Sequence, residues 1–110
     1  MSRMAVQITI YFTEGDSFRG RPLHLQMLKC LEDEHVENAV VLHASAGFVG
    51  GSRIKTSSLV DAGGKLPLLL IAVDEEDKIT RVLPRLKEMV GEKRTIAREN
   101  VTIEHGVLAR

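Results

Sequence analysis

Residues 46–54 read AGFVGGSRI and bring three glycines and one arginine together, which makes them the segment best suited to hold an anion. A glycine-rich backbone can turn its N–H groups toward a phosphate, and Arg53 and Lys55 could supply positive charge. The segment is no Walker motif, because Gly64 and Lys65 are followed by leucine instead of serine or threonine. It is also no dinucleotide fingerprint, because no helix follows it directly. On the residues alone, a phosphate cradle and a flexible surface loop have equal weight.

A second glycine-led basic turn, GEKRT, occupies residues 91–95. Its ordinary interpretation is a helix C-cap at Gly91 followed by solvated charges. The functional interpretation is that Lys93 and Arg94 project toward a phosphate held between subunits. The acidic run DEED at residues 74–77 could suggest a metal, but acids at a helix start favour capping, so we expect no metal site there.

Side chains suited to hydrolytic catalysis are scattered along the chain. The histidines show no HExxH or other paired spacing, and no GxSxG nucleophile elbow is present. Cys30 is the only cysteine, which excludes an internal disulfide and favours a buried apolar role on a helix. The histidines are His24, His35, His43 and His105. From these observations we expect a protein that is not an enzyme.

The composition limits the classes of function and partner that remain. Lysine and arginine total 15, as do aspartate and glutamate, so no global field attracts nucleic acid or an anionic membrane. Aromatic residues make up only 4%, which leaves few stacking platforms for single-stranded nucleic acid. The longest apolar run, residues 66–73, is far short of a membrane span. We expect one domain over residues 1–110, in the cytoplasm, with no nucleic-acid partner and no membrane insertion.

The apolar pattern divides the chain into six elements in the order β-α-β-β-α-β. Alternating apolar residues indicate the first strand, and apolar residues at helical spacing indicate both helices. This order predicts an α+β, ferredoxin-like sandwich, in which two helices cover one face of a four-stranded antiparallel sheet. The expected strands are residues 5–13, 38–45, 66–73 and 94–103, and the expected helices run from Leu23 to Glu34 or His35 and from the N-cap Asp74 to Val90.

Prolines and a glycine mark the expected limits of the helices. Pro22 is placed in the first turn of the first helix, where its missing N–H is harmless. Pro84 is expected to interrupt the second helix, by bending it or by lowering its stability, and Gly91 to end it.

Two of the expected strands carry large apolar residues on both faces. Val41 faces opposite to Val40 and Leu42, and residues 68–71 read LLLI. Such strands are typical of a sheet that is covered on both sides. Because two helices cover only one face, we expect the other face to pack against further subunits in a homo-oligomer.

The connection between the second and third strands, residues 46–65, is expected to be structureless and is far longer than usual. Loops of this length are generally functional or disordered. Glycines near both ends of the connection look like hinges, and they are Gly47, Gly50, Gly51, Gly63 and Gly64.

With these features in place, the chain resembles the PII-like group of trimeric regulators and, more narrowly, the domain of unknown function 190 family. The segments that carry the resemblance are ITIYFTEGD, GRPLHLQMLKCL, AGFVGG, KLPLLLIAVDEEDKI and ENVTIE. The resemblance implies a homotrimer whose sheets line its interior. It also implies an adenine nucleotide, as AMP, ADP, ATP or a cyclic form, in clefts between subunits.

In the proteins that the chain resembles, the long loop closes over the nucleotide and docks on a partner, and the turn after the second helix holds phosphates. By position, the loop is residues 46–65 and the turn is residues 91–95. The implied partner is an unidentified regulated protein, such as a transporter or an enzyme. The nucleotide-binding residues implied by the resemblance are Gly47, Phe48, Gly50, Gly51, Arg53, Gly91, Lys93 and Arg94.

The chain departs from the signalling members of this group at several positions. Glu92 runs directly into Lys93 without the extra glycine of their phosphate turn, and Glu104 and His105 replace basic residues after the last strand. Residues 46–65 contain no tyrosine, so uridylylation is not expected. Two alternatives stay open: a structural or metal-responsive trimer like the divalent-cation tolerance proteins, and an enzyme acting on a phosphorylated small molecule.

Overall fold

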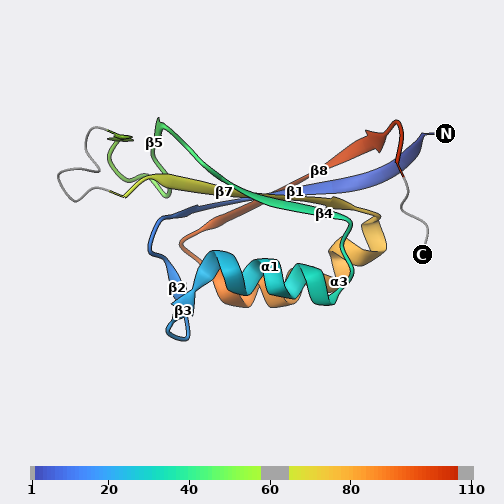
Figure 1. Cartoon of the computed structure of the whole chain (residues 1–110), viewed down its shortest axis with the longest axis horizontal. Helices are drawn as coiled ribbons and strands as arrows, with labels where there is room; N and C mark the ends of the chain where they lie inside the picture. The colour runs from blue at the N-terminus through green and yellow to red at the C-terminus, as the bar shows by residue number, and fades with distance from the viewer. Residues whose placement is uncertain (1, 58–64, 107–110) are drawn as a thin grey trace.

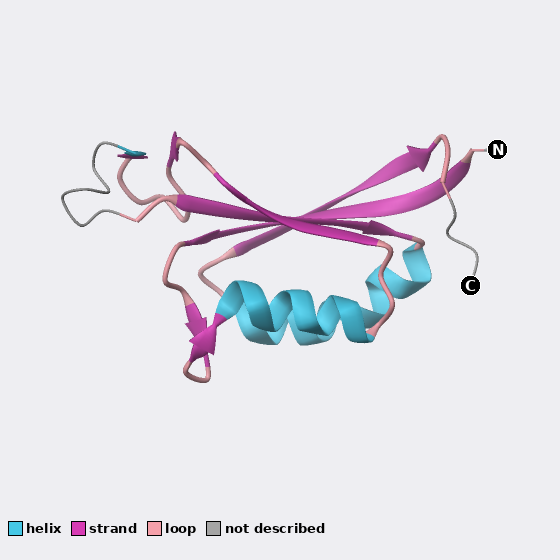
Figure 2. Cartoon of the chain, in the orientation of Figure 1, coloured by secondary structure: helices cyan, strands magenta, loops and turns pink. Residues whose placement is uncertain are grey.

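The computed structural model describes residues 2–57 and 65–106. Two helices lie side by side against one face of a twisted, four-stranded antiparallel sheet with the strand order β4-β7-β1-β8 (Figures 1 and 2). The predicted ferredoxin-like, α+β fold is therefore confirmed. Its main elements are β1 (Arg3–Thr13), α1 (Leu23–Asp33), β4 (Asn38–His43), β7 (Pro67–Asp74), α3 (Glu76–Val90) and β8 (Thr95–Ile103).

The hydrophobic core lies between the sheet and the two helices. Alternate residues of β1 are buried because a strand directs successive side chains to opposite faces. Cys30 is buried on α1, as its surroundings in the sequence indicated, and burial raises the pKa of its thiol. The fully buried core residues include Ile8, Ile10 and Phe12 of β1, Leu23, Met27 and Leu31 of α1, and Ile79, Val82 and Leu86 of α3.

Two short antiparallel pairs add to this frame. β2 (Ser17–Phe18) and β3 (Arg21–Pro22) form a hairpin before α1. β5 (Ala46–Gly47) pairs with β6 (Lys55–Thr56), so the prediction that residues 46–65 are structureless is wrong for this part. The hinge glycines predicted at positions 63 and 64 lie outside the described residues.

The second helix differs from its predicted form. Asp74 is the last residue of β7, and the N-cap of α3 is Glu75. The buried Asp74 carboxylate instead accepts hydrogen bonds from the main-chain N–H groups of Glu37 and Glu75, which hold it at the end of the strand. Pro84 does not interrupt α3, which continues to Val90; that it bends the helix or lowers its stability stays a prediction. Pro84 is exposed, so solvent can reach the carbonyl that the missing proline N–H leaves free.

Smaller differences occur at the ends of other elements. Pro22 precedes α1 as its N-cap and does not belong to its first turn, because its ψ of 126° is extended. β4 ends at His43, two residues earlier than predicted, and Ala44 instead donates a main-chain hydrogen bond to the Pro67 carbonyl. No helix among the described residues is long and apolar enough to cross a membrane.

The sheet face opposite the helices, here called the open face, is covered by no described helix, and the segment after β5 reaches it only beside Tyr11 (Figure 1). Cross-strand pairing places Leu42, Leu69 and Tyr11 in one row of this face, and Val40 and Ile71 in the next. Val40 is 50% exposed and Leu42 is 47% exposed. The prediction of strands that are apolar on both faces is thus confirmed, and the homo-oligomer that would cover the open face stays a prediction.

Candidate functional site

The glycine segment after β5 and the basic turn after α3 meet beside Tyr11. Two adjoining cavities, of about 240 and 260 Å³, share Tyr11, Val49 and Gly50 in their walls. We call the two together the Tyr11 cleft. The other residues that line it are Phe12, Thr13, Asp16, Lys93 and Arg94 in one cavity, and Phe48, Gly51 and Thr95 in the other.

The backbone conformation of the glycine segment favours glycine at two positions. Gly50 and Gly51 have φ angles of 60° and 71°, in the left-handed region that glycine adopts readily. A Cβ atom added to Gly50 would lie 3.4 Å from the main-chain oxygen of Lys93, whereas one added to Gly51 would meet nothing within 4 Å. Gly50 therefore lies beside the basic turn, about one side-chain carbon away from its main chain.

Arg94 is held in place by two hydrogen bonds. Its Nε donates to Oδ2 of Asp16 at 2.8 Å, and its Nη1 donates to the Val90 carbonyl at the end of α3 at 2.8 Å. The same Asp16 oxygen accepts a hydrogen bond from the Thr13 N–H at 3.0 Å. Asp16 thus joins the end of β1 to the basic turn. The Lys93 side chain, in contrast, forms no ion pair within the described part of the chain.

The structure brings some of the predicted residues together and leaves others apart. Phe48, Gly50, Gly51, Lys93 and Arg94 all line the Tyr11 cleft. The remaining three do not line it: Gly47 lies in β5, Arg53 is exposed, and Gly91 is the C-cap of α3, where it donates a hydrogen bond to the Lys87 carbonyl.

The list of predicted site residues missed six residues that line the cleft: Tyr11, Phe12, Thr13, Asp16, Val49 and Thr95. Tyr11 and Thr95 are direct cross-strand partners in β1 and β8. A register for these two strands, derived from their alternating patterns, could have placed the pair at this end of the sheet. Nothing in the local sequence indicated that Asp16 contacts Arg94.

Glu14 fastens the long connection where it leaves and rejoins the sheet. Its Oε1 accepts a hydrogen bond from the Leu66 N–H at 2.7 Å, and its Oε2 lies 2.9 Å from Nε2 of His43. The bond from Leu66, followed by the contact with His43, lowers the pKa of the Glu14 carboxyl. His43 is thus a surface residue paired with an acid, in keeping with the structural role that the sequence favoured.

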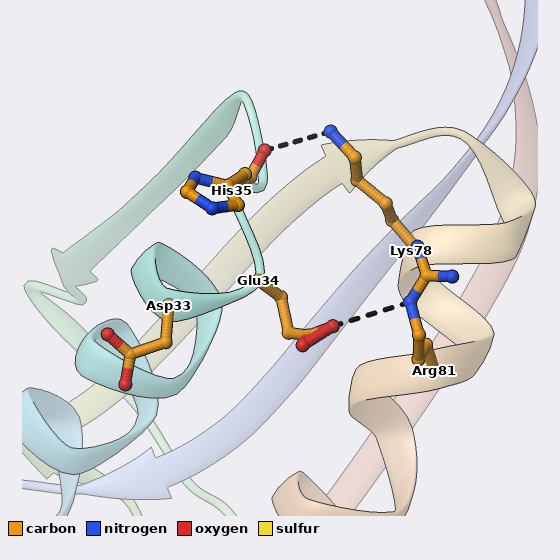
Figure 3. Close-up of a pocket in the computed structure, with 5 residues that line it drawn as sticks. All are labelled: Asp33, Glu34, His35, Lys78 and Arg81. Atoms are coloured by element: carbon orange, nitrogen blue, oxygen red, sulfur yellow. Dashed lines mark hydrogen bonds and ion pairs between the residues drawn. The ribbon is translucent and has the colours of Figure 1, made fainter. Parts of the chain in front are cut away.

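A larger cavity, of about 620 Å³, lies at the C-terminal end of α1 (Figure 3). Its charged groups are largely satisfied by one another. Lys78 Nζ donates to the His35 carbonyl at 3.0 Å, and Arg81 Nε lies 3.4 Å from the Glu34 carboxylate. The Asp33 carboxylate points away from these cations (Figure 3). No group of three or more metal-ligating side chains gathers here or elsewhere in the described ranges.

Comparison with solved structures shows the PII-like fold. The CPII protein of Thiomonas intermedia, bound to ADP and bicarbonate, aligns with a TM-score of 0.70 at 9% identity over 96% of this chain and 93% of that one. A putative PII-like signalling protein of Thermus thermophilus gives 0.60 at 17% identity, over 93% and 89%. The divalent cation tolerance protein CutA of Archaeoglobus fulgidus gives 0.56 at 15% identity, over 94% and 87%.

Sequence comparison identifies the family. A UPF0166 protein of Aquifex aeolicus is 31% identical over 80 residues, which are 73% of this chain and 76% of the relative. The family model described as DUF190, Uncharacterized ACR, matches residues 5–103. The two matches agree with the resemblance that the sequence motifs carried. The chain belongs to the DUF190 family.

Proposed function

We propose that this protein is a PII-like regulator that binds an adenine nucleotide in the Tyr11 cleft, at a boundary between the subunits of a homotrimer. The observation that carries the proposal is that Gly50 and Lys93 lie beside each other and line one cavity, which brings the glycine segment and the basic turn to one cleft. The main-chain N–H groups of the glycine segment and the ammonium group of Lys93 are suited to bind a phosphate.

The apolar part of the cleft suits the base of a nucleotide. Phe48 and Tyr11 both line it, and both are partly exposed, at 59% and 39%. Aromatic rings stack on bases, and burial of their exposed area would favour binding. The structural neighbour from Thiomonas intermedia has ADP bound, which supports this ligand class.

The position of the cleft supports its completion by a second subunit. Phe48, in the wall of one of its cavities, is largely exposed. Tyr11 also belongs to the open face, which an assembly would cover. In this proposal, residues 46–65 report the occupancy of the cleft to a regulated protein, because residues 48–51 at the start of this connection form one wall of the cleft.

Calorimetric titration with AMP, ADP, ATP and cyclic AMP tests the proposal. We expect one of them to bind, and Lys93→Ala to weaken that binding by about tenfold or more, as the loss of one charge-assisted hydrogen bond predicts. Lys87→Ala is the matched control, since Lys87 is an exposed lysine at the end of α3 that does not line the cleft. Absence of heat with every nucleotide at millimolar concentration would refute the proposal.

Two further experiments extend the test, one with an Arg53 variant and one with divalent cations. Arg53 lies on the same connection but outside the cleft, so Arg53→Ala weakens binding only if the connection closes over the ligand. Titration with divalent cations alone addresses the cation-tolerance alternative. Saturable binding of a metal without binding of any nucleotide would favour that alternative.

A further inference from the structure

The charge balance of the Tyr11 cleft depends on one acidic residue. Among the residues that line the cleft, Asp16, Lys93 and Arg94 are the charged ones. Arg94 and Asp16 form an ion pair of 2.8 Å, with side chains that are only 28% and 23% exposed. The positive charge of Arg94 is therefore largely offset within the protein, and Lys93 supplies the net positive charge of the lining.

We propose that Asp16 determines the number of phosphate groups that the cleft accepts, and that it favours a nucleoside monophosphate over a triphosphate. This inference rests on the proposed function of the cleft. A single phosphate monoester carries about −1.5 to −2 charges at pH 7. Each additional phosphate adds negative charge, and the described residues that line the cleft include no further cation to meet it while Asp16 holds Arg94.

The position of Asp16 is fixed by several contacts within the protein. Its carboxylate accepts the Thr13 N–H, and its main-chain carbonyl accepts the Leu23 N–H at the start of α1, at 2.9 Å. Arg94 is equally constrained, because Nη1 donates to the Val90 carbonyl. Nη2 makes no hydrogen bond within the described residues, so Arg94 can still face a phosphate, but with its charge offset.

Replacement of a residue that only supports the fold would weaken the binding of all nucleotides alike. A residue that sets the charge of the site changes the ratio of their affinities. The informative measurement is therefore the ratio of the AMP and ATP dissociation constants, in Mg²⁺-free buffer because a bound cation would mask phosphate charge. For the unchanged protein we expect AMP to bind at least about tenfold more tightly than ATP, the factor for one unmatched charge-assisted contact.

Asp16→Asn removes the negative charge but keeps an oxygen that can accept the Thr13 N–H. We expect it to shift the ratio toward ATP by about tenfold. Arg94→Gln removes the cation and leaves the acid, so it shifts the ratio further toward AMP, even if it also lowers stability. Asp33→Asn, the same chemical change at the far end of α1, leaves the ratio unchanged.

The outcomes separate this inference from the proposed function. If no nucleotide binds the unchanged protein, the proposed function fails and the inference fails with it. If ATP binds as tightly as AMP or more tightly, the inference is overturned while the cleft remains a nucleotide site. An unchanged ratio in Asp16→Asn overturns the inference as well, whatever the effect of Arg94→Gln.

Discussion

Replacement of Asp74 by alanine should destabilise the fold more than any ordinary surface change. The Asp74 side chain is fully buried at the end of β7. Its carboxylate accepts the Glu37 N–H at 2.9 Å and the Glu75 N–H at 2.6 Å, and Lys78 Nζ lies 3.5 Å away. It thus joins the end of β7 to the segment before β4 and to the start of α3.

The expected magnitude follows from the groups that lose their acceptor. An unsatisfied buried N–H costs about 1–3 kcal/mol, so two of them cost about 2–6 kcal/mol. Glu37 and Glu75 are only half-buried, and water can partly replace the lost oxygens. We therefore expect Asp74→Ala to lower the free energy of unfolding by about 2–4 kcal/mol.

Urea unfolding followed by circular dichroism, at pH 7 and one fixed protein concentration, measures this loss. Asp33→Ala is the control, because Asp33 is 47% exposed and pairs with Lys29 at the surface, where such pairs are worth at most about 1 kcal/mol. If Asp74→Ala costs no more than Asp33→Ala, the structural role assigned to the buried carboxylate is refuted.

Three further predictions concern other parts of the molecule. The contacts that lower the Glu14 pKa, chiefly the hydrogen bond from the Leu66 N–H, stabilise the fold at neutral pH. This stabilisation is lost in acid, as the pH falls through the lowered pKa. The difference in unfolding free energy between the unchanged protein and Glu14→Gln should therefore shrink below about pH 4.3. Ile71→Lys on the open face should dissociate the assembly in analytical ultracentrifugation, while Leu25→Lys on the exposed side of α1 should not, and equal sedimentation of the two variants would contradict the proposed interface. Gly91→Ala should lower the free energy of unfolding by about 1–2 kcal/mol, because its φ of 68° strains any other residue, and an unchanged melting temperature would count against this.

The main elements of the fold were predictable because their apolar patterns are long. The alternation from Val6 to Phe12 and the helical stripe of α3 each persist over several turns or pleats, and the core forms where these patterns indicated. The pair β5 and β6 has only two residues in each strand. Such short pairs are fixed by the packing of the surrounding chain, so no local pattern reveals them.

The site was only partly predictable, for a related reason. Glycine and basic residues have a recognisable local chemistry, which pointed to Gly50 and Lys93, and both line the cleft. The contact between Asp16 and Arg94 joins residues 78 positions apart in the sequence, and it forms because the basic turn leads into β8, the neighbour of β1 in the sheet. Asp74 was misassigned because acids at a helix start usually act as caps, whereas here strand and helix meet without a connecting turn.

Tyr11 stands at the boundary of two surfaces, the open face and the Tyr11 cleft. If subunits pack through the open face, the free energies of assembly and of ligand binding are linked by mass action. A nucleotide that binds only the assembled form then strengthens assembly by the same factor by which assembly strengthens binding. The apparent affinity would fall on dilution of the protein, so cellular abundance would adjust the sensitivity of the response along with nucleotide concentration.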